Sequence, residues 1–382
     1  MTAPTGPLDK AATEARQFLE ARWPDWHRAL GDAVPPVASA GTCARSAMFL
    51  ARVLRQSGQS ATVVHGTRPD AAEGYFDGIR WHGHSWVSSG DYIIDITADQ
   101  FGDAPVVICQ SDDPRYRAGE DTALPRFKRK RQTDVDALWQ DWTLQQARAA
   151  GLHEVLISDT CRILARHRPD PSHKTVLLSF TGIRFGLGGV HYGGAEFRGL
   201  GERFDNTLFL YDLTRSWGNH LDWDQIAQQL APFVQGRHVD AIGNSMGGFL
   251  AILASRILTL QTVISMVPQY SVHPDLMPEE TRWKRYTRKI SDWPCPSLDG
   301  CFQPTTRYTI ITADNPAEQR HWSRFPVLDN INLYALSHDR HGLGNSLKKQ
   351  GALAPILTAA LEGQLTETLI AHHWPTGVRK IN

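Results

Sequence analysis

The chain has 382 residues, of which 41% are hydrophobic and 21% are charged, and 40 basic residues balance 40 acidic ones. This length exceeds the size at which one hydrophobic core usually keeps growing, so we expect two domains, and the composition excludes a disordered or fibrous chain. A net charge of zero argues against nucleic acid or a membrane surface as a partner. Five cysteines, with neither an apolar leader nor a stretch able to span a bilayer, favour reduced thiols and a cytoplasmic protein.

The first elements are predicted to be two helices. Apolar residues recur at helical spacing over residues 8–30, ahead of Gly31 and two prolines. A second apolar stripe predicts a helix over residues 43–56, and Gly58 provides its stop signal. Short β runs follow at residues 61–67, 83–88 and 91–97. Together these segments predict a small α+β unit.

The middle of the chain predicts a change of domain. Residues 111–133 are rich in Asp, Arg, Pro and Lys and have few apolar side chains, which is typical of an exposed connection. Later, apolar β runs alternate with Gly-rich turns and helical stretches, as in a doubly wound parallel sheet. These runs lie at residues 176–180, 207–211, 239–242, 262–267, 308–312 and 331–336. We therefore expect a first domain over 1–130, a linker helix over 131–150 and a second domain over 151–382.

A serine motif stands in the second domain. The segment Gly243-Asn244-Ser245-Met246-Gly247 directly follows a predicted strand and directly precedes an apolar helix. This context is typical of a nucleophile elbow, a sharp turn that exposes a serine hydroxyl. Its two glycines are needed because the turn brings neighbouring backbones too close for side chains. The motif predicts Ser245 as a nucleophile.

On this motif, the chain from residue 152 onward resembles the α/β-hydrolase family. The resemblance implies an order of serine, then an acid after a later strand, then a histidine after the last strand. It identifies Asp314 as the acid and His341 as the base, with His338 as the alternative base. It also implies an oxyanion hole built from backbone N–H groups of Met246 and of Gly182 or Ile183.

A segment near this motif fits neither helical nor strand periodicity. Residues 268–301 are rich in aromatic residues and proline, and we expect them to form a cap over the site. The stretches Val267-Pro268-Gln269-Tyr270 and Arg282-Trp283 resemble α/β-hydrolase-like proteins found with bacterial polysaccharide and glycosyltransferase systems.

A cysteine motif stands in the first domain. Cys43 follows Gly41-Thr42 at the predicted first turn of a helix, where backbone N–H groups and the helix dipole stabilise a thiolate. A two-residue hairpin at Ser89-Gly90 places His84 directly opposite Asp95. Asp95 can then orient His84, and His84 can act as the base for Cys43. His82 is the alternative base, and a buried core cysteine is the alternative role for Cys43.

This order of Cys, His and Asp resembles the papain-like transglutaminase superfamily over about residues 35–110. The resemblance implies acyl transfer through a thioester. Transglutamination, deamidation and proteolysis share that step, so the residues leave the choice among them open.

The two motifs together predict a bifunctional hydrolase or acyl transferase. The serine site is expected to cleave an ester or acyl group, and the cysteine site to act on an amide or peptide. Two alternatives stay open: one active domain whose companion only binds substrate, and a non-catalytic interaction scaffold. The remaining cysteines lack paired metal-ligand spacing, so we expect no metal and no cofactor. The expected partner is a small-molecule or peptide substrate, and the oligomeric state is left open.

Overall fold

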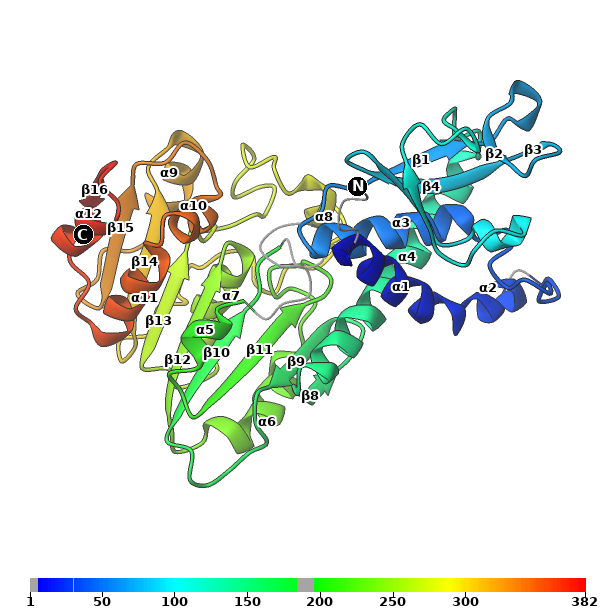
Figure 1. Ribbon diagram of the computed structural model, residues 1–382. Coiled ribbons are helices and arrows are strands. Elements are labelled where there is room, and N and C mark those ends of the chain that lie inside the picture. Colours follow the sequence, from blue (N-terminus) through cyan, green and yellow to red (C-terminus); the bar gives the residue numbers. More distant parts are fainter. Residues whose placement is uncertain (1–5, 30, 184–195) are drawn as a thin grey trace. The chain divides into compact units, whose positions relative to one another are not determined.

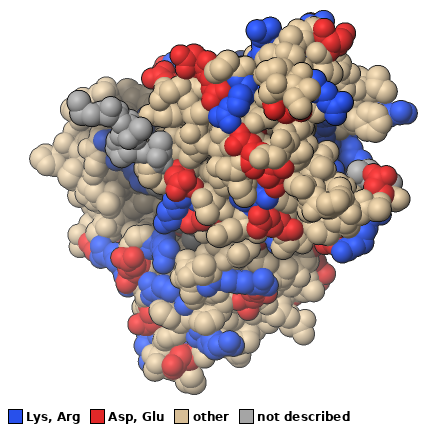
Figure 2. All heavy atoms as spheres, turned by 45° about the vertical axis from the view of Figure 1, so that its right-hand side comes forward, with Lys and Arg blue, Asp and Glu red and all other residues tan. Residues whose placement is uncertain are grey.

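The computed structural model describes residues 6–29, 31–183 and 196–382 (Figure 1). The described residues form two compact units, the first reaching Ala147 and the second starting at Arg148. Within the described part of the chain, no helix is both long enough and apolar enough to cross a membrane. Figure 2 shows Lys and Arg side chains interspersed with Asp and Glu over the face that it draws.

The first unit packs helices against one face of an antiparallel sheet. The helices are α1 (Gly6–Glu20), α2 (Trp23–Ala29), α3 (Cys43–Gln56) and α4 (Pro125–Ala149). The sheet has the order β1-β4-β5-β6, with β1 (Thr62–Gly66), β4 (His84–Ser89), β5 (Tyr92–Asp95) and β6 (Val107–Gln110). A second sheet has the order β3-β2-β7, with β3 (Trp81–His82), β2 (Gly74–Phe76) and β7 (Tyr116–Arg117).

Two buried clusters hold this unit together, one on each face of the four-stranded sheet. Val87 and Ile94 are paired across β4 and β5 and pack in the cluster that includes the apolar stripes of α1, α3 and α4. Trp86 and Ile93 point to the opposite face, where they join an aromatic cluster with Tyr75 and Tyr116. The alternation follows from the two-residue period of a strand.

Two predictions for the first unit need correction. The helix expected over residues 8–30 is two helices, because Pro24 at the start of α2 has no N–H to continue α1. The expected connection over residues 111–133 contains β7 and the first turns of α4. Lysines in the exposed first turns of α4 form ion pairs: Lys128 with Asp121, which precedes the helix, and Lys130 with Asp134.

The hairpin between β4 and β5 turns one residue later than predicted. Ser89 pairs with Tyr92, so the loop is Gly90-Asp91, and Gly90 takes the positive φ of +57° that the turn requires. His84 and Asp95 are therefore diagonal neighbours rather than directly opposed residues. A register shift of two residues keeps the same face, so both side chains still point to one side of the sheet.

The second unit is built on a nine-stranded sheet of order β16-β15-β14-β13-β12-β10-β11-β9-β8. Six central strands are parallel, and the three others pair antiparallel with their neighbours. The parallel strands are β10 (Thr175–Phe180), β11 (Asn206–Asp212), β12 (His238–Asn244), β13 (Thr262–Met266), β14 (Arg307–Ala313) and β15 (Ile331–Leu336). The others are β8 (His153–Ile157), β9 (Cys161–Ala165) and β16 (Val378–Lys380).

Helices cover both faces of this sheet, because its central strands are apolar on both faces. Leu178 and Ala241 share a core with side chains of α6 and α7, whereas Leu177 and Ile242 share a core with side chains of α10, α11 and α12. The helices are α5 (Arg198–Gly201), α6 (Trp223–Val234), α7 (Met246–Ala254), α8 (Lys284–Thr287), α9 (Pro316–Trp322), α10 (Leu343–Lys349), α11 (Leu353–Glu362) and α12 (Glu367–His373). All six predicted strands of this unit are present.

Candidate functional site

Ser245 lies at the turn between β12 and α7, in the strand-to-helix context that the sequence predicts. Its backbone has φ +59° and ψ −120°, a conformation that residues other than glycine rarely adopt. The residue is 3% exposed. Strained backbone of this kind persists only where the surrounding structure holds it in place, and it concentrates at functional sites.

The two glycines of the motif are required by close backbone contacts. A Cβ on Gly243 would lie 2.0 Å from the carbonyl oxygen of Gly247, and a Cβ on Gly247 would lie 2.2 Å from the carbonyl oxygen of Phe180. Real Cβ atoms do not approach a backbone oxygen so closely, so the elbow cannot form with side chains at these positions. The steric reason inferred from the motif holds in the structure.

A hydrogen-bonded chain links Ser245 to a histidine and an acid. The Ser245 Oγ lies 2.7 Å from Nε2 of His341, on the loop that precedes α10. The other ring nitrogen, Nδ1, lies 2.9 Å from Oε1 of Glu318, in the first turn of α9. Since the carboxylate accepts the proton on Nδ1, Nε2 is free to accept the serine proton. This geometry is that of a serine triad.

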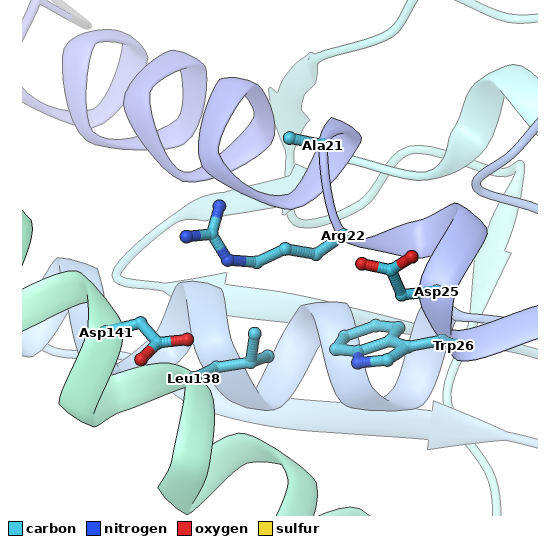
Figure 3. Close-up of a pocket in the computed structure, with 6 residues that line it drawn as sticks. All are labelled: Ala21, Arg22, Asp25, Trp26, Leu138 and Asp141. Atoms are coloured by element: carbon cyan, nitrogen blue, oxygen red, sulfur yellow. The ribbon is translucent and has the colours of Figure 1, made fainter. Parts of the chain in front are cut away.

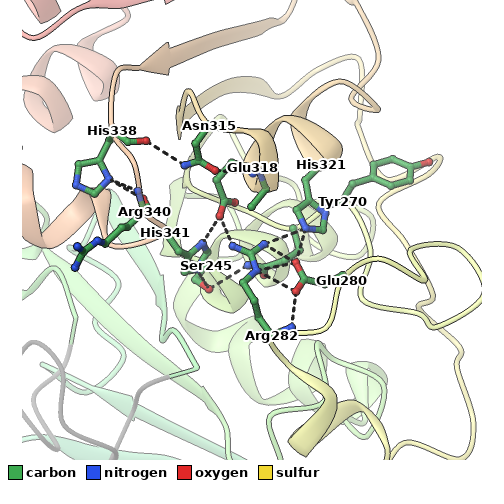
Figure 4. A network of polar contacts seen from close by, with 12 residues as sticks. Ser245, Tyr270, Glu280, Arg282, Asn315, Glu318, His321, His338, Arg340 and His341 are labelled. Carbon is green, nitrogen blue, oxygen red and sulfur yellow. Dashed lines mark hydrogen bonds and ion pairs between the residues drawn. The ribbon is translucent and has the colours of Figure 1, made fainter.

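The carboxylate that contacts His341 is that of Glu318, not that of the predicted Asp314. Asp314 directly follows β14, but both of its carboxylate oxygens accept hydrogen bonds from Arg379 of β16, at 2.8 and 2.9 Å. The chain then enters α9, and one turn of helix carries Glu318 toward His341 (Figure 4). The structure therefore does not bring Asp314 to the histidine as the sequence predicted, because its side chain pairs with the last strand.

The structure also separates the two candidate histidines. Nε2 of His338 lies 2.9 Å from the Ser346 hydroxyl, and its Nδ1 lies 2.6 Å from the carbonyl oxygen of Arg340, so both ring nitrogens have partners other than Ser245. His341 alone of the two reaches the serine.

A buried network of charges holds Glu318 in place (Figure 4). Arg282 donates to Glu318 and to Glu280, and His321 lies 2.9 Å from Glu280. Burial alone would raise the pKa of Glu318, but the contacts with His341 and Arg282 outweigh it, so the pKa stays below its ordinary value. Glu318 therefore remains ionised next to His341. Arg282 and Glu280 come from residues 268–301, the segment predicted to cap the site.

Two of the residues predicted for the oxyanion hole, Met246 and Gly182, lie at the serine elbow. Met246 is the first residue of α7, directly after the serine, and Gly182 lies against the backbone of Asn244. The Gly182 N–H, however, donates a 3.1 Å hydrogen bond to the carboxylate of Glu196. The Ile183 carbonyl accepts from Arg215 at 3.0 Å. A substrate oxyanion that used the Gly182 N–H would have to displace Glu196.

Replacing Glu196 is expected to change how stability depends on pH. Burial raises the pKa of Glu196 to about 7, against the opposing effect of the bond from Gly182. In the unfolded chain the pKa of a glutamate is about 4.3, so between this pH and the folded-state pKa the folded protein binds more protons than the unfolded chain. The free energy of unfolding therefore falls as pH rises through this window, and Glu196→Gln removes that fall.

Urea unfolding of both proteins at about pH 5 and about pH 8 measures this effect. Relative to Glu196→Gln, the unmodified protein should lose stability at the higher pH. If the difference in the free energy of unfolding between the two proteins is the same at both pH values, the pKa of Glu196 is not raised.

In the first unit, the structure brings Cys43, His84 and Asp95 together. His84 is fully buried, and its Nε2 lies 2.6 Å from Oδ2 of Asp95. Asp95 also accepts hydrogen bonds from Thr97 and from the Tyr116 hydroxyl. These contacts orient the imidazole through Nε2, and the other ring nitrogen, Nδ1, is buried and accepts or donates no hydrogen bond among the described residues.

The charges of this trio favour a thiolate. Burial alone would raise the pKa of the Cys43 thiol, but the interaction with His84 outweighs it, and the pKa is lowered. Burial alone would lower the pKa of His84, but Asp95 outweighs it and raises the pKa to about 10. The lowered pKa of Cys43 and the raised pKa of His84 both favour an ion pair of thiolate and imidazolium. Cys43 itself is half-buried at the start of α3.

The alternative base in this unit has another partner. His82 lies 2.6 Å from the carboxylate of Asp77, in the hairpin that joins β2 and β3. The turn that precedes Cys43 is held by Gln100, whose side-chain oxygen accepts a 3.3 Å hydrogen bond from the Gly41 N–H.

A surface pocket of about 510 Å³ lies elsewhere in the first unit (Figure 3). Figure 3 shows Arg22 extending between Asp25 and Asp141, with Trp26 and Leu138 beside it. None of the three candidate catalytic residues of this unit lines it. Among the described residues, no cluster of three or more His, Cys, Asp or Glu side chains is placed to hold a metal ion.

No protein-family model matches the sequence, and no curated protein matches it. Solved structures similar to the chain include a capsule O-acetyltransferase of Neisseria meningitidis serogroup A, at 15% identity over 51% of this chain and 91% of that one, with a TM-score of 0.36. A 2,6-dihydroxy-pseudo-oxynicotine hydrolase is similar at 14% identity over 63% and 76% of the two chains, with a TM-score of 0.37. MGS-MChE2, an α/β-hydrolase enzyme from a lagoon-sediment metagenome, is similar at 18% identity over 52% and 96%, with a TM-score of 0.31.

The second unit has an α/β-hydrolase-like fold. Its parallel sheet carries helices on both faces, and the serine elbow joins the central strand β12 to α7. The chain order of the linked side chains is Ser245, Glu318 and His341, with the acid after β14 and the histidine after β15. The sequence predicted this order with a different acid. Glu318 and the residues that support it were not found from the sequence.

Proposed function

We propose that the second unit is a serine-dependent acyl hydrolase or acyl transferase. The observation that carries the proposal is the chain of hydrogen bonds from Ser245 through His341 to Glu318, at 2.7 and 2.9 Å. A serine hydroxyl is a weak nucleophile until a base removes its proton, and the ionised acid keeps the imidazole in the tautomer that can do so.

The chemistry then proceeds in two halves. Ser245 Oγ attacks the carbonyl carbon of an ester or acyl group while its proton passes to Nε2 of His341, and the leaving group takes that proton as it departs. The acyl-enzyme is released when His341 activates water, which gives hydrolysis, or an acceptor hydroxyl, which gives transfer. The Met246 N–H, at the start of α7, is the proposed donor to the oxyanion, with Gly182 as its partner once Glu196 is displaced.

A fluorophosphonate probe tests the nucleophile directly. The folded protein should be labelled faster than the unfolded protein, and Ser245→Ala should lose the label. Ser265→Ala is the matched control, because Ser265 is also a buried serine of the same sheet but makes no contact with His341. Labelling that survives in Ser245→Ala, or that is no faster in the folded protein, would count against the serine site and favour the scaffold alternative.

We also propose a second activity, acyl transfer from an amide or peptide through a thioester on Cys43. The 2.6 Å hydrogen bond between His84 and Asp95 supports it, and so does the effect of His84 on the Cys43 thiol, whose pKa is lowered. In this reaction the Cys43 thiolate attacks the carbonyl carbon, and His84 gives its proton to the leaving amine. The likeness to the papain-like transglutaminase superfamily remains a prediction, and so does a protein with two working sites.

A further inference from the structure

A buried side-chain amide contacts the proposed nucleophile. Gln269 lies three residues after β13 and is fully buried. Its Nε2 lies 3.2 Å from Ser245 Oγ, and its Oε1 lies 3.0 Å from Nε1 of Trp217. No role in the serine triad uses this amide.

The orientation of the amide follows from its partners. An indole nitrogen can only donate, so the atom that faces Trp217 has to be the amide oxygen. The NH₂ group is therefore directed at Ser245. Since Ser245 gives its own proton to His341, its oxygen accepts the hydrogen bond from Gln269.

The backbone on both sides is held in unusual conformations. Trp217 has φ +52°, and Val267, two residues before Gln269, has φ +45°. A β-branched residue rarely adopts a positive φ, so this loop is under strain. Asp212 stabilises the loop of Trp217, because its Oδ2 accepts from the Ser216 and Gly218 N–H groups at 2.8 and 3.1 Å. The loops after β11 and β13 thus hold an amide donor at the serine oxygen.

We propose that Gln269 is a further catalytic residue of the serine site. Its N–H donates to Ser245 Oγ and stabilises the negative charge that develops there as His341 takes the proton and the bond from Oγ to the carbonyl carbon forms. It does so again when that bond breaks and Oγ regains its proton from His341. The inference rests on the proposed serine acyl transfer, and it adds a donor to the nucleophile that is separate from the oxyanion hole.

Two variants test the inference through the second-order rate constant for fluorophosphonate labelling. Gln269→Met keeps the size of the side chain but cannot donate, and we expect labelling to slow by about 10²-fold, the order of loss when one donor to developing charge is removed. Gln269→Glu keeps the shape, and Trp217 can still donate to it. Its carboxylate repels negative charge on Oγ and competes with His341 for the serine proton, so we expect a larger loss.

The pH profile separates a catalytic from a packing role. Relative to the unmodified protein, labelling of Gln269→Glu should fall further as pH rises and the new carboxyl group ionises, whereas a packing defect would lower labelling by the same factor at every pH. Trp217→Phe removes the group that orients the amide, and we expect an intermediate loss.

The outcomes are distinct. Labelling of both Gln269 variants within about threefold of the unmodified protein, well short of the loss expected for a missing donor, would overturn this inference alone. Absence of Ser245 labelling in the unmodified protein would overturn the serine site and this inference together. Circular dichroism and urea unfolding of each variant show whether the fold is retained.

Discussion

Glu318→Gln is expected to lower turnover of an activated ester such as p-nitrophenyl acetate by as much as about 10⁴-fold, the loss found when the acid of a serine triad becomes an amide. Arg282 and Nδ1 of His341 both contact Oε1 of Glu318, so we expect the amide oxygen to take this position and the NH₂ group to take the position of Oε2. The variant then lacks the negative charge that stabilises the imidazolium formed when His341 takes the serine proton. Steady-state kinetics, with fluorophosphonate labelling as a second readout, measure the loss.

Asp314→Asn provides the control within the same segment. Among the described residues, the Asp314 carboxylate accepts side-chain hydrogen bonds only from Arg379, whose side chain is 52% exposed. An exposed ion pair contributes about 1 kcal/mol or less, so we expect turnover to change by less than about threefold. The reverse pattern, a large loss in Asp314→Asn and a small one in Glu318→Gln, would restore the acid predicted from the sequence.

The second large effect is expected at Cys43. In the unmodified protein, iodoacetamide should alkylate Cys43 at about pH 6, because the imidazolium of His84 lowers the pKa of the thiol. His84→Ala removes that charge, and a thiol with the ordinary pKa of about 8.5 holds only about one thiolate in 300 at pH 6. We expect alkylation at this pH to slow by about 10² to 10³-fold and its midpoint to move upward. Peptide mapping of the modified protein identifies the alkylated cysteine.

Two controls exist in the same unit. Cys109 is also half-buried, but burial and the nearby Asp113 raise its pKa to about 12, so it should stay unmodified at this pH. His82→Ala removes a neighbouring histidine that pairs with Asp77, and it should leave the alkylation of Cys43 unchanged. A Cys43 titration curve that is the same with and without His84 would favour the alternative in which Cys43 is only a core residue.

Local patterns in the sequence were sufficient for several parts of both sites. The helix that starts at Cys43 was predicted with its observed bounds, because an apolar stripe and a following glycine are encoded within one short segment. The elbow at Ser245 was predicted for the same reason, since the strand, the glycines and the helix are contiguous. His84 and Asp95 were placed on one face by the two-residue period, although the hairpin register was wrong by two residues.

Local patterns did not identify the carboxylate that contacts His341. Asn315 caps α9, Pro316 follows it, and Glu318 stands three residues after the cap, a pattern typical of a capping box. The pattern has a sufficient local explanation, so nothing in it indicates a catalytic role. Asp314 occupied the expected position after the strand, and only the pairing of β16 with β15 shows that Arg379 engages it.

By itself, the sequence determined the order of strands and helices and the local turn that exposes a serine, because backbone propensity and steric crowding act over a few residues. The tertiary structure decided which carboxylate reaches His341, that Glu196 meets the Gly182 N–H, and that Gln269 contacts the serine. The contacts of Glu318 with His341 and of Gln269 with Ser245 join loops that follow different strands, and Gly182 and Glu196 are 14 residues apart in the connection after β10. Their geometry depends on how the sheet brings loop ends together, and no short stretch of sequence contains that information.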